Sequence, residues 1–174
     1  MDDVDGRKSL LAASGLKWGR VLDVGMGDCA CMSFFLARRG FDVVGIDRSS
    51  HAVHVARRDA AEKRFKGHFE AKRADARRLP FQDGQFDATL AYHTLHHVDG
   101  LGRAVAEMAR VCKPGGLILV AEFHQEGAEV YQHHLNWDAL HARIEGALQR
   151  QARLVRKVRT RLNVICVFRK LRKL

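Results

Sequence analysis

Short apolar runs alternate along the chain with longer stretches in which apolar residues recur at helical spacing. The short runs predict five strands, at residues 21–24, 41–47, 68–75, 86–92 and 117–123. The longer stretches predict helices over residues 29–39, from a cap at Ser49 or Ser50 to about Lys63, and from a cap at Asp99 through Arg110. Strands and helices that alternate in this way indicate parallel βαβ units, with helices on both faces of one sheet.

The C-terminal part of the chain follows a different pattern. A helix is predicted from about Leu135 to Gln149, followed by strands at residues 154–161 and 164–169. Because almost nothing separates these two strands, we expect them to form an antiparallel hairpin. The segment KPGG at residues 113–116 predicts a turn before the fifth strand.

Length and composition are those of a globular protein. The chain has 174 residues, of which 47% are hydrophobic and 29% charged, so it can bury a sizeable core. No apolar run reaches the roughly 18 residues that a membrane span needs. The first ten residues, MDDVDGRKSL, are acidic and polar, unlike a secretory signal peptide. We therefore expect a single domain over residues 1–174, no membrane partner and a cytoplasmic location.

The net charge of +10 is concentrated at the C-terminal end. From Arg150 onward there are ten Lys or Arg residues and no Asp or Glu, whereas residues 1–149 hold 20 basic and 20 acidic residues. The basic strand at 154–161 suits a sheet edge, where charge blocks edge-to-edge aggregation. The alternative is a surface that attracts nucleic acid or an anionic substrate. We favour the edge strand.

The cysteines do not form a recognisable metal or redox motif. Cys29 and Cys31 are two residues apart, which is not the C-x-x-C spacing, and Cys112 and Cys166 stand alone. We expect four small, mostly buried thiols and no metal.

The segment from Asp23 to Cys29 has the features of a ligand-binding loop. Gly25 and Gly27 can adopt unusual backbone angles and let a ligand approach the main chain. The N-terminus of the following helix offers free N–H groups. Asp47 lies 20 residues after Gly27, where a carboxylate can accept ribose hydroxyls. These features also fit a nicotinamide dinucleotide, so they do not select the cofactor.

Two further acids discriminate between the cofactors. Asp23 lies two residues before the first glycine, where a carboxylate disfavours a pyrophosphate but suits an ammonium or sulfonium group. Asp75, after the third strand, can accept a hydrogen bond from an exocyclic adenine amine. Together with the closing hairpin, these acids favour a sulfonium nucleoside.

Several spaced motifs resemble those of class I S-adenosylmethionine-dependent methyltransferases, in the small type 11 branch typified by ubiquinone/menaquinone biosynthesis. They cover about residues 21–123 in the usual order: VLDVGMGDC, VVGIDRS, ADARRLPFQDGQFDATLAYHTLHHV and EMARVCKPGGLILVAEF. Cys29 departs from the pattern, since many members have a third glycine there. The resemblance implies an α/β Rossmann-like methyltransferase fold: a single doubly wound domain with a mostly parallel seven-stranded sheet whose last strand is antiparallel.

The resemblance also implies site residues, with turn geometry and helix capping as the alternative explanation. Asp23, Gly25 and Gly27 would hold the methionine part of S-adenosylmethionine. The remaining positions are assigned as follows: Asp47 with Arg48 at the ribose, Asp75 with Ala76 at the adenine, and Ala91 or Tyr92 bordering the methionine part and the methyl group.

Histidines supply the candidate catalytic groups. Methyl transfer from a sulfonium is an in-line displacement, and a general base is needed only if the acceptor must lose a proton. His93, His96 and His124 are candidates to face the substrate, whereas we expect a structural role for His97. A metal cluster of His96, His97, His124 and His133 lacks supporting ligand spacing, so no metal is expected.

These features predict a methyltransferase that acts on a small-molecule acceptor with S-adenosylmethionine. Three alternatives stay open: an RNA methyltransferase that uses the basic C-terminal segment, a non-catalytic cofactor-binding regulatory module, and, least favoured, a nicotinamide oxidoreductase. The sequence leaves a homodimer open.

Overall fold

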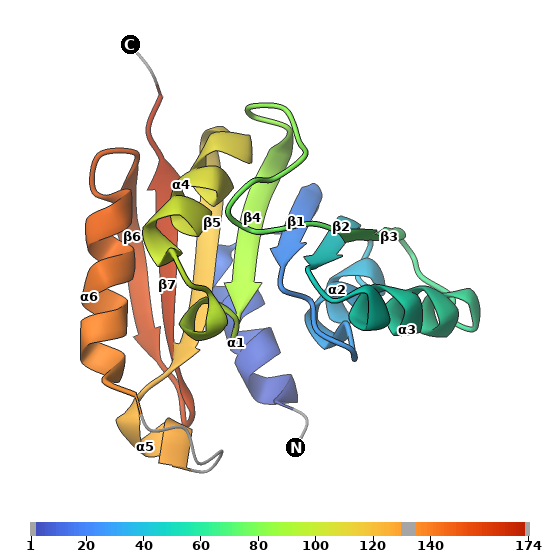
Figure 1. Cartoon of the computed structure of the whole chain (residues 1–174), viewed down its shortest axis with the longest axis horizontal. Helices are drawn as coiled ribbons and strands as arrows, with labels where there is room; N and C mark the ends of the chain where they lie inside the picture. The colour runs from blue at the N-terminus through green and yellow to red at the C-terminus, as the bar shows by residue number, and fades with distance from the viewer. Residues whose placement is uncertain (1–2, 130–134, 173–174) are drawn as a thin grey trace.

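The computed structural model describes residues 3–129 and 135–172 (Figure 1). Its strands are β1 Arg20–Val24, β2 Asp42–Asp47, β3 His68–Arg73, β4 Phe86–Tyr92, β5 Cys112–Phe123, β6 Ala152–Arg159 and β7 Asn163–Lys170. Its helices are α1 Val4–Ser14, α2 Cys31–Ala37, α3 Ser50–Ala61, α4 Leu101–Val111, α5 Gln125–Glu129 and α6 Trp137–Leu148, with a 3-10 turn η1 at Leu95–His97.

The strands form one seven-stranded sheet in the order β3-β2-β1-β4-β5-β7-β6. The first five of these are parallel, and β7 is inserted antiparallel between β5 and β6. This arrangement confirms the predicted doubly wound α/β fold. From β1 the chain winds outward through β2 and β3 and then crosses back to β4. The carboxyl ends of β1 and β4 therefore form the topological switch point, where such sheets bind ligands.

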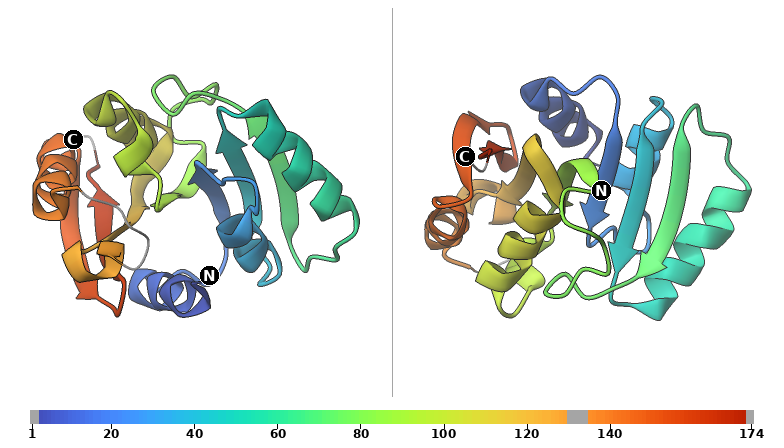
Figure 2. Two further views of the ribbon diagram at one scale, coloured as in Figure 1. Left: turned by 60° about the horizontal axis from the view of Figure 1, so that its bottom comes forward. Right: turned by 90° about the horizontal axis from the view of Figure 1, so that it is seen from above.

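Helices cover both faces of the twisted sheet (Figure 2). On one face, α4 and α6 pack through side chains such as Met108, Trp137 and Ile144. On the other face, α1 and α2 contribute Leu10 and Phe35, among others, to a separate apolar cluster. The central strands are buried on both faces, as expected of a parallel sheet between two helix layers.

The hairpin β6–β7 confirms the predicted C-terminal arrangement. β6 lies at the sheet edge and is largely exposed, whereas β7 is largely buried. Two of the basic side chains of β6 pair with acids on neighbouring helices: Lys157 with Glu145 at 2.8 Å and Arg159 with Glu126 at 2.9 Å. In the described part of the chain, none of the helices combines the length and the apolar character needed to cross a membrane.

Helix caps agree only in part with the prediction. Ser49 caps α3, and its hydroxyl accepts a hydrogen bond from the N–H of Ala52 at 3.2 Å. The predicted cap at Asp99 is wrong, because Gly100 occupies the N-cap of α4 without a side-chain bond. Gly100 has a left-handed backbone with φ of 78°, which turns the chain into α4 without a side-chain cap.

Other boundaries also differ from the prediction. α2 begins at Cys31, because Ala30 adopts a left-handed conformation with φ of 43°. Cys29 is exposed in the preceding loop, and Cys31 is half-buried, so only two of the four thiols are buried. β5 begins at Cys112, so the expected turn at residues 113–116 lies within that strand, where the register with β4 shifts.

Candidate functional site

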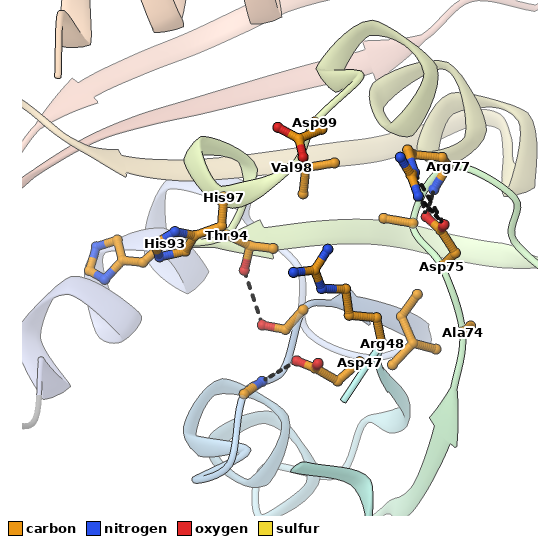
Figure 3. Close-up of a pocket in the computed structure, with 14 residues that line it drawn as sticks. Asp47, Arg48, Ala74, Asp75, Arg77, His93, Thr94, His97, Val98 and Asp99 are labelled. Carbon is orange, nitrogen blue, oxygen red and sulfur yellow. Dashed lines mark hydrogen bonds and ion pairs between the residues drawn. The ribbon is translucent and has the colours of Figure 1, made fainter. Parts of the chain in front are cut away.

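Two adjoining cavities lie at the carboxyl ends of the central strands. The acidic cavity, of about 400 Å³, is lined by carboxylates at Asp47, Asp75 and Asp99 (Figure 3). The helix-side cavity, of about 500 Å³, lies between the glycine loop and α1 and contains Asp23. Three residues line both cavities: Gly25, Gly27 and His93. The two cavities are therefore neighbouring parts of one candidate ligand-binding region.

The glycine loop is fixed on two sides. The N–H groups of Gly25 and Met26 both donate to the carbonyl of Ile46 in β2, at 2.9 and 3.0 Å. The hydroxyl of Thr94 donates to the carbonyl of Gly25 at 3.0 Å. Gly25 has φ of 75°, and a Cβ there would overlap the Thr94 side chain. Glycine is thus required at position 25 for both conformation and space.

Asp47 lines the acidic cavity and is held there by main-chain donors. The N–H of Gly27 donates to Oδ2 at 3.1 Å, and the N–H of Ser49 donates to Oδ1 at 2.9 Å. Each carboxylate oxygen keeps acceptor capacity for a ligand. Arg48 lines the same cavity, next to Asp47 (Figure 3).

Asp75 lies at the other end of the acidic cavity from His93 (Figure 3). Its carboxylate forms a bidentate pair with the Arg77 guanidinium, with Nε–Oδ1 and Nη2–Oδ2 distances of 3.0 and 2.7 Å. This side-chain pairing and the Arg77 main-chain N–H lower the pKa of Asp75 to about 2. Asp75 is therefore a fixed carboxylate. Ala76 lines the cavity beside it.

Asp23 is almost completely buried, with 1% exposure, at the end of β1. The Ser33 hydroxyl donates to its Oδ2 at 2.6 Å. Burial raises the pKa of Asp23 to about 7 even though the Ser33 hydrogen bond acts in the opposite direction. A nearby cationic ligand would favour the ionised form.

At the end of β4 the two predicted positions differ. Ala91 is fully buried in the core and lines neither cavity. Tyr92 lines the helix-side cavity, together with Asp3 and Arg7 of the N-terminal segment.

Glu122, at the end of β5, organises the loop that follows β4. It is fully buried, and its Oε1 accepts hydrogen bonds from the N–H groups of Thr94 and Leu95 at 3.1 and 2.7 Å. Its Oε2 lies 2.7 Å from Nδ1 of His96. Sequence reasoning did not assign this role, although an acid within an otherwise apolar strand was a visible signal.

The three candidate catalytic histidines are not brought together. His93 lines both cavities, whereas His96 is buried against Glu122 and Trp137 and lines neither of them. His124 is also buried away from them, and its Nε2 lies 3.2 and 3.1 Å from the carbonyls of Thr160 and Arg161. His97 lines the acidic cavity.

No metal centre is assembled by the side chains that the structure describes. Within residues 3–129 and 135–172 there is no group of three or more metal-ligating side chains. His133, a member of the cluster considered from the sequence, lies outside the described residues.

Sequence comparison finds a match to a methyltransferase domain over residues 22–120. A demethylmenaquinone methyltransferase of Beutenbergia cavernae is 39% identical over 118 residues, which are 67% of this chain and 46% of that protein. A ubiquinone/menaquinone biosynthesis C-methyltransferase of Teredinibacter turnerae is 37% identical over 120 residues, covering 67% and 48%. The chain thus spans about half the length of these curated relatives.

Solved structures share the whole fold at lower identity. A Pyrococcus horikoshii protein superposes with a TM-score of 0.79 at 21% identity, covering 96% of this chain and 89% of that one. An S-adenosylmethionine-dependent methyltransferase of Methanosarcina mazei gives a TM-score of 0.75 at 22% identity, covering 94% and 98%. The domain match, the fold and the glycine loop agree with the resemblance read from the sequence, and the chain belongs to the class I methyltransferases of the type 11 branch.

Proposed function

We propose that the protein transfers a methyl group from S-adenosylmethionine to a small-molecule acceptor. The observation that carries this proposal is the position of Asp23 and Asp47 on either side of the glycine loop, at the switch point of the sheet. The names of both curated relatives describe methyltransferases of quinone metabolism, which supports a small-molecule acceptor.

The chemistry of the acidic cavity fits the donor. The ribose hydroxyls and adenine amine of a nucleoside are hydrogen-bond donors, and the carboxylates of Asp47 and Asp75 are acceptors. Apolar walls at Ile46, Ala74 and Val98 suit a flat ring. A sulfonium near buried Asp23 would gain an ionised carboxylate as its partner, whereas the pyrophosphate of a dinucleotide would gain no favourable charge pair there.

We assign the binding residues accordingly. Asp23, Gly25 and Gly27 hold the methionine part, and Tyr92 rather than buried Ala91 borders it. The nucleoside contacts are Asp47 and Arg48 at the ribose, and Asp75 and Ala76 at the adenine.

When bound, S-adenosylmethionine supplies an electrophilic methyl group on a sulfonium. The chain's own residues position the two reactants, which is the main requirement of an in-line displacement. Fixed carboxylates and main-chain dipoles do this without reorganising during the reaction.

RNA methylation and a purely regulatory role receive less support. The basic β6 strand lies at the sheet edge, apart from the two cavities, and two of its charges are already paired with Glu126 and Glu145. A cytoplasmic location and a homodimer stay predictions.

Thermal unfolding with added ligands tests the proposal. S-adenosylhomocysteine at about 100 times its Kd should add about 2.7 kcal/mol to the free energy of unfolding. NAD and NADP are the comparison ligands, and Asp47→Ala is the site variant expected to lose the shift. Stabilisation by a nicotinamide dinucleotide alone would contradict the proposal.

A further inference from the structure

A chain of hydrogen bonds connects the start of α1 with His93. Asp3, the N-cap of α1, accepts the N–H of Gly6 on Oδ1 at 2.9 Å. Its Oδ2 accepts the Tyr92 hydroxyl and the Asn163 side-chain Nδ2, the latter at 2.7 Å. The Asn163 Oδ1 in turn meets Nε2 of His93. The network thus joins segments that are as much as 160 residues apart.

This network determines which ring nitrogen of His93 carries the proton. Partial burial acts to raise the pKa of Asp3, but hydrogen bonds from Tyr92, Asn163 and the Gly6 N–H outweigh it and lower that pKa. Asp3 is therefore a carboxylate, which can only accept. Asn163 must turn its NH₂ group toward Asp3, and this leaves its carbonyl oxygen for His93. A neutral imidazole has one N–H, so the proton is on Nε2 and the lone pair is on Nδ1.

His93 lines both cavities, and Nδ1 is the ring nitrogen that the network leaves without a proton. His93 has φ of 52°, a left-handed conformation that non-glycine residues adopt rarely and often at functional sites. Its ring stacks on Phe123, with centroids 3.9 Å apart. Within the described residues Nδ1 has no hydrogen-bond partner. It is not a buried atom, so a ligand can reach it. Burial lowers the pKa of His93, which favours the neutral ring.

We infer that Asp3 and Asn163 are positioning residues that hold His93 as the Nε2–H tautomer, so that its Nδ1 accepts the proton of a hydroxyl-bearing methyl acceptor. The inference rests on the proposed methyl transfer and narrows its substrate class. The new bond joins the acceptor oxygen to the methyl carbon, the S–C bond breaks with its electron pair on sulfur, and the hydroxyl proton goes to Nδ1. A base placed in this way typically contributes about 10²–10⁴-fold to the rate.

Nitrogen NMR of the full chain tests the tautomer directly. Two-bond ¹H–¹⁵N correlations distinguish protonated from unprotonated ring nitrogens, and the signals of His93 are identified by their absence in His93→Gln. In the wild-type protein we expect a protonated Nε2 and an unprotonated Nδ1. The other titratable groups that face His93 are Glu122, His96 and Tyr92, so the spectra are recorded across the titration of His93. A proton on Nδ1 of the neutral ring would overturn the inference.

Asp3→Asn tests the role of the carboxylate. Asparagine caps helices as well as aspartate does, so α1 keeps its cap. Its amide can also donate, which frees the Asn163 amide to turn its NH₂ toward His93. We expect the Nδ1–H tautomer to appear, together with a loss of kcat of about tenfold or more for a hydroxyl acceptor. Asp5→Asn is the matched control, because Asp5 lies in the same helical turn with a 96% exposed side chain. An Asp3→Asn spectrum identical to wild type would overturn the inference.

Calorimetric titration with S-adenosylhomocysteine separates this inference from the proposed function. If the wild-type chain binds the ligand but shows Nδ1–H, the inference fails and the proposed function stands. If the chain does not bind the ligand, the proposed function fails, and the assignment of His93 as the base for methyl transfer fails with it even if Nε2 is protonated.

Discussion

A carboxyl group buried without a cation holds its proton more tightly than one in water, and Asp23 is in that position. Its pKa is raised by burial to about 7, from a usual value of 3.8. Between these values the folded chain keeps a proton that the unfolded chain loses. Stability therefore falls as pH rises through this window, by about 1.4 kcal/mol per pH unit.

Asp23→Asn should remove this pH dependence. The amide oxygen can still accept the Ser33 hydroxyl, so we expect the variant to be more stable than wild type above about pH 7 and to lose that advantage toward pH 4. Urea denaturation at several pH values measures the difference. Asp28→Asn, at an exposed position of the same loop, is the control and should change little. An advantage that does not depend on pH would show that ionisation of Asp23 is not its cause.

The ionisation of Asp23 should also affect the affinity for the cofactor. A cationic ligand favours ionised Asp23, so affinity for S-adenosylmethionine should fall as pH drops below about 7, by up to about tenfold per unit. Asp23→Asn should bind weakly at every pH. Calorimetry in buffers of different ionisation enthalpy would detect the proton released on binding by the wild-type chain. No proton release near pH 6 would contradict this account.

Sequence reasoning could identify residues whose role depends on local chain geometry. Gly25, Gly27 and Asp47 belong to a strand, loop and strand whose spacing is visible in the sequence, and the structure places all three at one cavity. Asn163 and Asp3 could not be identified in this way. The two residues are 160 positions apart in the sequence, and their contact depends on how α1 packs against the end of β7.

At the scale of elements, α1 was the clearest omission from the prediction. Its sequence mixes charged and small residues, and Leu10 and Ala13 are its only buried apolar residues. The central strands were predicted well, because apolar runs buried on both faces leave a strong pattern. The N-terminal turn of α1 also fits against the polar network at the ends of β4 and β7, where Asp3 binds Tyr92 and Asn163. The hydrophobic periodicity of the sequence does not reveal such a fit.

Gly6 makes that fit possible, and Gly6→Ala should disrupt it. A Cβ at this position would overlap the Tyr92 hydroxyl and the side chains of Asp3 and Asn163. Alanine favours a helix by about 0.5–1 kcal/mol over glycine, but overpacking costs about 1–3 kcal/mol, so we expect a net loss of stability. The His93 tautomer should also become mixed.

Gly146→Ala is the control for intrinsic helix preference. Gly146 lies inside α6, and a Cβ there meets nothing within 4 Å. We therefore expect this variant to raise the thermal midpoint while Gly6→Ala lowers it. If both substitutions raised the midpoint equally, α1 would not depend on close approach to the network.

On the scale of the whole molecule, the basic excess is concentrated in one hairpin at the sheet edge, far along the sheet from β3. Arg153 in β6 lies directly opposite Arg169 in β7. The register shift between Leu154 and Arg156 pairs Arg156 with Val167, which places it on the same face as Arg153. Like charges opposite each other destabilise a strand pair. The edge thus resists pairing with another sheet at some cost to its own stability.

Arg153→Glu should relieve this repulsion. A cross-strand ion pair with Arg169 would replace the like-charge pair, and we expect stabilisation by about 0.2–1 kcal/mol. Because the residues are exposed, the gain should shrink in about 1 M salt, where screening is strong. Arg150→Glu, in the turn before β6, makes the same change in net charge without a cross-strand partner. Urea midpoints at low and high salt measure both variants. Equal gains in the two variants would attribute the effect to net charge alone, whereas a larger gain in Arg153→Glu would locate the repulsion in the hairpin.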